Sequence, residues 1–482
     1  MTRAPAFARW ALAPAAAQLV ALLATSTRYG YHRDELYFIV AGSHPALGYP
    51  DQPPLVPLVC RAMHDLWPSL VVLRLPSALV AAATTVVAAL VAREAGGARR
   101  AQTIAAACTA ASGFALAVGH FVTTTTFDLL STSLFLWLVI RAVVRRSGPA
   151  MLAAGVVVGV GCEAKPQVGF VAAVVVAALL VVGPREVLRS RWTLGGVVAA
   201  VAIAAPYVVW QQRHGWPQVT VAGNIGGSAE GGRIGFVPFQ LLLVSPVLVP
   251  VWVAGLALPY RRPGLRALRF VTVTYGVLAV AYIVGNGKAY YLASLYPVLL
   301  GLGALRAAEW RRRRSLLVAI ALSAVVSAFI ALPLLPARSL QGNFVMAINP
   351  DQGETVGWPR FVATVGRAWR SLPAAERART AIFTANYGEA GAVDVLGRGL
   401  PRAYSGHNGF SEWGTPPPRD AHAIVLGYDG PRDAAPAFSG CRTLARIDDR
   451  VGLSNDEQGL PVLFCRPAAS WARLWPKLTH YD

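Results

Sequence analysis

An acidic pair, Asp34 and Glu35, follows the first apolar segment of the chain, and a third acid, Asp51, comes after a turn that contains proline. Ionised side chains beside a bilayer are costly, so those that occur there are usually functional. A carboxylate held against a hydroxyl group can act as a general base. The pattern therefore predicts proton transfer in this stretch. The alternative is a solvated loop in which one acid pairs with Arg28 or Arg33.

A further acid, Asp128, follows a run of four threonines at the start of a later apolar segment. A single acid at a helix N-terminus is often only a capping residue or one stabilised by the helix dipole. The functional interpretation is a second acid that faces Asp34 across a pocket and helps to bind the substrate. The aromatic residues Tyr31, Tyr37 and Tyr49 could line that pocket or form an interfacial belt.

Lysine is rare in this chain, which has 3 lysines against 41 arginines. Two of them, Lys165 and Lys288, lie at ends of apolar segments on the same expected face as Asp34. A compact ammonium suits a phosphate oxygen as a point charge, so these positions predict a site for an anionic phosphate. Alternatively, Lys165 pairs with Glu163 and Lys288 only extends its side chain toward the interface.

Three residues invite a test for a divalent metal ion: Asp51, His64 and His214. A carboxylate and a histidine from separate loops can bind such an ion. None of the three stands in a metal-binding motif, so the sequence predicts no certain cofactor. His214 lies before Gly215-Trp216-Pro217 and would fit an interfacial turn equally well.

The elements that must position these residues are apolar helices, because the chain is 55% hydrophobic. A membrane-spanning helix needs about 20 apolar residues, and about eleven segments come close to that length. The first has no obvious small-residue cleavage site, so it is interpreted as an anchor. The segments lie near residues 8–27, 70–92, 101–119, 127–144, 150–164, 166–184, 193–212, 237–258, 268–286, 289–308 and 315–335.

The distribution of the net charge of +20 along the chain is explained by membrane topology. With eleven spans and a cytoplasmic N-terminus, five clusters of arginine all fall on one side, as the positive-inside rule requires. This distribution argues against nucleic-acid binding. The same parity predicts a multi-pass protein of the cell membrane, with the Asp34 loop and the tail after Pro336 outside.

The composition changes near Pro336, since ten acids precede it and fourteen follow it. We therefore expect a transmembrane domain at 1–336 and a small extracytoplasmic α/β domain at 337–482. On this topology the two cysteines of the tail, Cys441 and Cys465, lie in an oxidising compartment. They form a disulfide there or remain two free thiols.

The chain resembles bacterial glycosyltransferase family 39-like membrane proteins over about 28–310. These proteins are similar to protein O-mannosyltransferases and to the lipid A aminoarabinose transferase. The resemblance extends into the tail at Asn386-Tyr387-Gly388-Glu389-Ala390 and from Ser405 to Gly414. Its motifs, in family order, are Asp34-Glu35-Leu36-Tyr37, Tyr49-Pro50-Asp51-Gln52-Pro53-Pro54-Leu55, Arg74-Leu75-Pro76, Thr126-Phe127-Asp128, Lys165, His214-Gly215-Trp216-Pro217 and Lys288-Ala289-Tyr290-Tyr291.

The resemblance implies a GT-C fold and transfer of a sugar from a polyprenyl-phosphate donor to a lipid, glycan or protein acceptor, with inversion at the anomeric carbon. Asp34 would deprotonate the acceptor hydroxyl, with Glu35 in support and Asp128 as a second acid of the pocket. Some relatives present a glutamate to a metal ion at the position of Asp51. The aspartate departs from that pattern, so a divalent metal at Asp51 and His214 stays a weaker expectation.

The resemblance also assigns substrate binding to Arg74, Lys165 and Lys288, together with Tyr290 and Tyr291. The lysines would neutralise the departing lipid phosphate, because fixed cations favour a transition state in which negative charge develops. A transporter or lipid-carrier flippase is the main alternative from another class, although paired halves with broken helices are not evident. Within the enzyme class, an oligosaccharide polymerase or ligase is a third interpretation.

Overall fold

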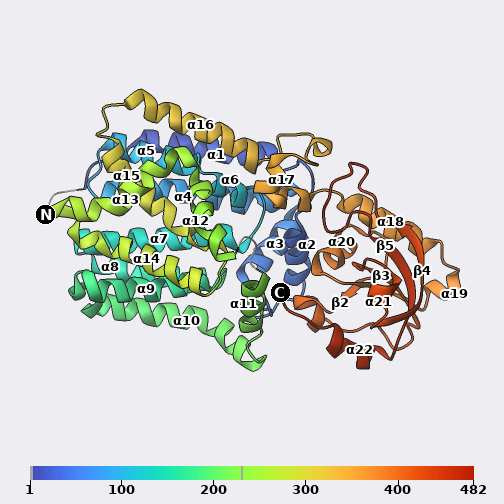
Figure 1. The fold of residues 1–482 in the computed structure, drawn as a ribbon. Helices are drawn as coiled ribbons and strands as arrows, with labels where there is room; N and C mark the ends of the chain where they lie inside the picture. Colours follow the sequence, from blue (N-terminus) through green and yellow to red (C-terminus); the bar gives the residue numbers. More distant parts are fainter. Residues whose placement is uncertain (1–3, 229–231) are drawn as a thin grey trace. The chain divides into compact units, whose positions relative to one another are not determined.

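The computed structural model describes residues 4–228 and 232–482. The chain divides into two compact units, which are described separately (Figure 1). The first comprises the N-terminal residues to Ser26, Arg74–Gln212 and Ile225–Leu332. The second comprises Thr27–Leu73, Arg213–Asn224 and Pro333–Asp482. The second unit therefore combines the tail with two shorter segments from the part of the sequence predicted to be transmembrane.

The first unit is helical throughout the described residues. Most of its helices are apolar, and several expose large apolar side chains, which is typical of helices that contact lipid as well as protein. Large side chains such as Val181, Leu317 and Val325 are accordingly exposed. The helices are α1 (Leu12–Thr25), α4 (Leu70–Glu94), α5 (Arg99–Ala110), α6 (Gly113–His120), α7 (Thr124–Arg145), α8 (Gly148–Cys162), α9 (Gln167–Val182), α10 (Arg191–Arg213), α12 (Gly232–Val244), α13 (Val249–Arg261), α14 (Arg269–Val284), α15 (Tyr296–Ala307) and α16 (Arg313–Ala331).

Within the described residues, five helices are long and apolar enough to cross a membrane. Two bent pairs, Arg99–Ala110 with Gly113–His120 and Arg233–Val244 with Pro246–Arg261, raise the number to as many as seven. Each of the eleven predicted apolar segments overlaps at least one helix. The protein is thus a multi-pass membrane protein, and the number of eleven crossings stays a prediction.

The second unit contains a five-stranded mixed sheet in the order β2-β1-β3-β5-β4. β1 pairs in parallel with β2 and β3, whereas β5 pairs antiparallel with β3 and β4. β1 and β3 are apolar runs buried on both faces, as expected for central strands. The strands are β1 (Thr380–Thr384), β2 (Ala403–Ser405), β3 (His422–Leu426), β4 (Phe438–Arg446) and β5 (Pro461–Pro467).

Two helices of this unit, α2 and α3, come from the N-terminal part of the chain, and most of the others are short helices of the tail. Cys441 of β4 and Cys465 of β5 form a disulfide, which confirms the pairing considered from the sequence. The helices are α2 (Arg33–Gly42), α3 (Leu55–Leu66), α11 (Pro217–Ser228, in its first part), α17 (Phe344–Ile348), α18 (Trp358–Arg370), α19 (Ala374–Arg377), α20 (Tyr387–Leu396), α21 (Pro431–Ala434) and α22 (Trp471–Leu478).

Helix α2 packs directly on helix α20 of the tail (Figure 1). The approach is close because Gly391 faces the backbone of α2, where an added Cβ would lie 2.9 Å from the carbonyl carbon of Leu36. A larger residue at 391 would separate the two helices. This contact brings the N-terminus of α2, with its acidic pair, beside the N-terminus of α20.

Candidate active site

The acidic pair begins helix α2, and its two members have different surroundings. His32 is the N-cap residue, and its Nδ1 accepts a hydrogen bond from the Asp34 amide at 3.2 Å. Glu35 is fully buried, and its Oε2 accepts from the His32 amide at 2.8 Å. This reciprocal arrangement is a capping box, which fixes the first turn of a helix. Glu35 therefore holds the turn that carries Asp34.

The Asp34 carboxylate is partly exposed, at 28% of its side-chain surface. Its Oδ1 accepts a hydrogen bond from the phenol of Tyr387 at 2.9 Å. Arg33 forms its ion pairs with two other acids, since its Nη1 lies 3.0 Å from Asp456 Oδ2 and 3.5 Å from Glu354 Oε2, although its charge also interacts with that of Asp34. These ion pairs do not support the alternative in which Arg33 neutralises the acidic pair. An accessible carboxylate with one fixed donor is suited to accept a proton.

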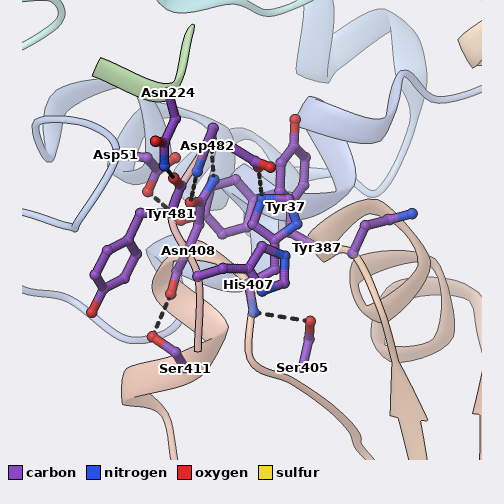
Figure 2. Close-up of polar contacts among 12 residues, drawn as sticks. Tyr37, Asp51, Asn224, Tyr387, Ser405, His407, Asn408, Ser411, Tyr481 and Asp482 are labelled. Atoms are coloured by element: carbon purple, nitrogen blue, oxygen red, sulfur yellow. Dashed lines mark hydrogen bonds and ion pairs between the residues drawn. The ribbon is translucent and has the colours of Figure 1, made fainter. Parts of the chain in front are cut away.

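A second carboxylate, Asp51, lies in the same unit and accepts a hydrogen bond from Tyr37 Oη at 2.6 Å (Figure 2). Burial raises the pKa of Asp51 to about 7, although the hydrogen bond from Tyr37 opposes this. The same phenol accepts from the Gly409 amide at 3.1 Å. Tyr37 also packs on Tyr387, with 4.8 Å between ring centroids. The residues around Asp34 are thus linked by aromatic packing and hydrogen bonds.

The predicted lysine site lies in the first unit. Lys165 Nζ lies 5.4 Å from the ring centroid of Tyr290 and 5.1 Å from that of Tyr291. Lys288 Nζ lies 6.0 Å from the Tyr290 ring. These distances are within the range of cation–π attraction. Lys165 also donates to Thr125 Oγ1 at 3.0 Å.

Asp128 belongs to the same cluster. It is buried, with 1% exposure, and it accepts hydrogen bonds from Ser294 and from Thr132, the latter at 3.3 Å. The charges of Asp128 and Lys288 both act on Lys165. Among the described residues, Lys165 forms no ion pair with Glu163, so the interpretation as a local pair finds no support. The structure brings two lysines and one carboxylate together.

The remaining predicted residues take other positions. Arg74 is buried, and its Nη1 donates to the Ser26 carbonyl at 2.6 Å, so its guanidinium supports the backbone and its predicted substrate contact stays a prediction. His214 is exposed, and it interacts electrostatically with Glu412. Asp51 is engaged by Tyr37, and neither Asp51 nor His214 belongs to a described group of three metal-binding side chains. We therefore assign no chemistry to a metal at these two residues.

Sequence reasoning missed two contacts of this site. It did not pair Tyr37 with Asp51, although both lie in one short stretch, and it gave Tyr387 no role. The signal for Tyr387 was present, because the Asn386–Ala390 motif belongs to the family resemblance. The motif does not indicate which residue the Tyr387 phenol contacts, because Asp34 is 353 positions away in the sequence.

The fold is similar to that of membrane proteins of known structure, and part of the chain matches a known family. Residues 51–210 match the family described as dolichyl-phosphate-mannose-protein mannosyltransferase, which confirms the resemblance indicated by the motifs. The chain is similar to ArnT from Cupriavidus metallidurans bound to undecaprenyl phosphate. The TM-score is 0.62 at 16% identity, over 96% of this chain and 99% of that one.

Two further comparisons agree on the fold. The apo state of the same Cupriavidus protein gives a TM-score of 0.62 at 16% identity, over 95% of this chain and 97% of that chain. Arabinofuranosyltransferase AftD from Mycobacteria gives 0.54 at 13% identity, over 98% of this chain but only 41% of the larger protein. No curated protein matches the chain in a sequence comparison.

Proposed function

We propose that this protein transfers a sugar from a polyprenyl-phosphate donor to an acceptor hydroxyl on the outer face of the cell membrane. The observation that carries the proposal is the gathering of Lys165 and Lys288 over Tyr290, beside buried Asp128. Such a cluster suits a phosphate that leaves with negative charge. The ArnT structure contains undecaprenyl phosphate, and the matched family is named for a dolichyl-phosphate sugar.

In the proposed reaction, Asp34 takes the proton of the acceptor hydroxyl. The acceptor oxygen forms a bond to the anomeric carbon, and the bond from that carbon to the phosphate oxygen breaks. The anomeric configuration inverts, and polyprenyl phosphate leaves as an anion that the two lysines neutralise. Tyr387 fixes one oxygen of Asp34 by its hydrogen bond, which leaves the other oxygen for the acceptor.

Asp128 has a supporting part in this scheme. Its charge lies near Lys165 and holds that ammonium in place, with Ser294 and Thr132 orienting the carboxylate. Glu35 positions Asp34 through the capping box. The sugar and the acceptor, whether lipid, glycan or protein, depend on contacts made by hydroxyl groups of a bound substrate.

The test is the release of free polyprenyl phosphate by the purified protein in lipid nanodiscs. A panel of polyprenyl-phosphate sugars serves as donors, and a crude envelope extract supplies acceptors. We expect release by the wild type and a loss of at least about 100-fold in Asp34→Asn, since a positioned general base contributes about 10²–10⁴-fold. Retained transfer in Asp34→Asn would refute Asp34 as the base and direct attention to Glu35.

The lysine site has its own matched control. Lys165→Ala removes the proposed phosphate contact, whereas Lys477→Ala removes the third lysine of the chain, which is exposed on α22. We expect Lys165→Ala to weaken donor use about 10–100-fold and Lys477→Ala to leave it unchanged. No release from any donor, together with movement of a labelled lipid carrier across the vesicle membrane, would favour the flippase alternative.

A further inference from the structure

The last residues of the chain pair with the segment that follows strand β2. His407 and His480 form a parallel bridge, in which the His480 amide donates to the Gly406 carbonyl and the Asn408 amide donates to the His480 carbonyl, both at 3.0 Å. The Asn408 side chain continues the pairing, since its Nδ2 donates to the Asp482 carbonyl at 3.0 Å and its Oδ1 accepts from the Asp482 amide at 3.2 Å (Figure 2).

Gly406 makes this pairing possible. An added Cβ at this position would lie 2.0 Å from the Leu478 carbonyl oxygen, so no larger residue allows the same approach. In an extended segment, residues two apart point to the same face. His480 and Asp482 are two apart, and they share that face with His407 across the bridge.

Three donor atoms of the types that bind zinc therefore converge. The donor atoms of His407, His480 and Asp482 all lie within 4.8 Å of one another. His407 Nε2 faces a carboxylate oxygen of Asp482, and the imidazole rings of His407 and His480 stack with 4.4 Å between centroids. Donor atoms around a tetrahedral zinc are about 3.3 Å apart for bonds near 2.0–2.1 Å, and three donor atoms within 4.8 Å of one another are near this spacing.

The ring nitrogens are arranged as in a metal site. His480 Nδ1 lies 2.8 Å from the Leu478 carbonyl oxygen. A carbonyl can only accept, so Nδ1 carries a proton, and in the neutral imidazole Nε2 then keeps a lone pair. Metal-binding histidines commonly have such a carbonyl partner, which fixes the tautomer. His407 is 6% exposed, and among the described residues its Nδ1 has no hydrogen-bond partner.

We propose that His407, His480 and Asp482 bind a divalent transition metal, with zinc the best fit to two imidazoles and one carboxylate. Three protein ligands leave a position for water. The ion links His480 and Asp482 to His407 in the segment after β2. Because the His407 ring packs 4.8 Å from that of Tyr387, the ion also stabilises the wall behind the tyrosine that contacts Asp34. Neither Asp51 nor His214 belongs to this group of three residues.

The experiment measures zinc itself, so its outcome does not depend on the proposed reaction. Full-length protein without a histidine tag is stripped with chelator, dialysed against Zn²⁺ and analysed for bound metal. Co²⁺ replaces zinc to give an absorption spectrum that reports the coordination geometry of the bound ion. We expect one ion per chain in the wild type, and an affinity at least about 10-fold weaker in His407→Gln, His480→Gln and Asp482→Asn.

Matched variants separate this site from others. His422→Gln changes a histidine that stacks on Phe464 outside the cluster and should keep full affinity, as should Asp51→Asn and His214→Gln. His480 is exposed, so His480→Gln keeps the fold even if the buried His407→Gln does not. Absence of stoichiometric zinc, unchanged affinity in His480→Gln, or loss of zinc in Asp51→Asn or His214→Gln alone would each overturn the proposal.

Discussion

The hydrogen bond from Tyr387 to Asp34 joins residues 353 positions apart and defines the orientation of the proposed base. Hydrogen bonds to charged groups contribute about 1.5–3 kcal/mol. The position of the Tyr387 ring is restricted by two neighbours, because it packs on Tyr37 and on His407. A phenol fixed in this way can hold one carboxylate oxygen still while the other accepts a proton. Tyr387 is therefore a positioning residue in the proposed reaction.

Tyr387→Phe removes the hydroxyl and keeps the ring packing. We expect kcat to fall about 10-fold with little change in KM for the donor, since about 1.4 kcal/mol corresponds to a factor of ten. Steady-state release of polyprenyl phosphate measures both quantities. Tyr404→Phe, in β2, is the control, because its ring contacts Arg402 and not the acidic pair. A rise in KM at constant kcat would contradict the positioning role.

At the scale of single elements, the capping box of α20 contains a buried acid. Glu389 is fully buried, and its Oε2 accepts from the Asn386 amide at 3.3 Å. Burial raises the pKa of Glu389 to about 8, against its ordinary value near 4.5. The folded state therefore favours the neutral acid. The stabilisation is complete below about pH 4.5 and is lost as the pH rises toward 8.

Glu389→Gln should remove this dependence, because the amide is neutral at every pH and keeps an acceptor for Asn386. We expect hydrogen exchange of peptides covering β1 and β5 to be similar in variant and wild type at pH 5. At pH 8.5 the variant should be at least about 10-fold better protected, since one pKa unit is worth about 1.4 kcal/mol. Asp433→Asn, at an exposed acid of the same sheet domain, should show no such change with pH.

The disulfide secures the edge of the sheet. β4 is the last strand in the order β2-β1-β3-β5-β4, and the bond from Cys441 to Cys465 ties it to β5 across a separation of 24 residues. Closing a loop of about 15 residues or more stabilises a fold by about 3 kcal/mol. We expect the double variant Cys441→Ser/Cys465→Ser to expose β4 to proteolysis. Reductant should also make β4 of the wild type sensitive to proteolysis, and it should not increase proteolysis of the variant further. If all samples resist proteolysis equally, the disulfide is not needed to protect this strand.

Sequence patterns predicted these elements unevenly. Long apolar runs located the helices of the first unit, because a lipid-contacting helix needs little more than hydrophobicity and length. The rarity and placement of Lys165 and Lys288 singled them out in the sequence, whereas their shared contact with the Tyr290 ring is seen only in the structure. The packing of α2 on α20 could not be predicted, since it depends on a close approach at Gly391 between distant segments. A short sequence motif does not show which distant residue it contacts, so the hydrogen bond from Tyr387 to Asp34 was not predicted.

At the scale of the whole molecule, the proposed function depends on topology. Asp34 and the sheet domain must lie outside, where a lipid-linked donor and not a nucleotide sugar is available. The arginine clusters predict this arrangement through the positive-inside rule. Among the described residues, the free cysteines are Cys60, Cys108 and Cys162, and the first two are buried. The chain therefore offers a low background for cysteine labelling.

Two introduced cysteines test the orientation in a Cys162→Ser background. Asp351 is exposed in the second unit, and Arg189 is exposed between α9 and α10 in an arginine cluster. A membrane-impermeant maleimide applied to intact cells should label Asp351→Cys at once and Arg189→Cys only after permeabilisation. The background protein without either change gives the baseline. Labelling of Arg189→Cys in intact cells would reverse the topology, and it would place Asp34 and the sheet domain away from the proposed outer-face donor.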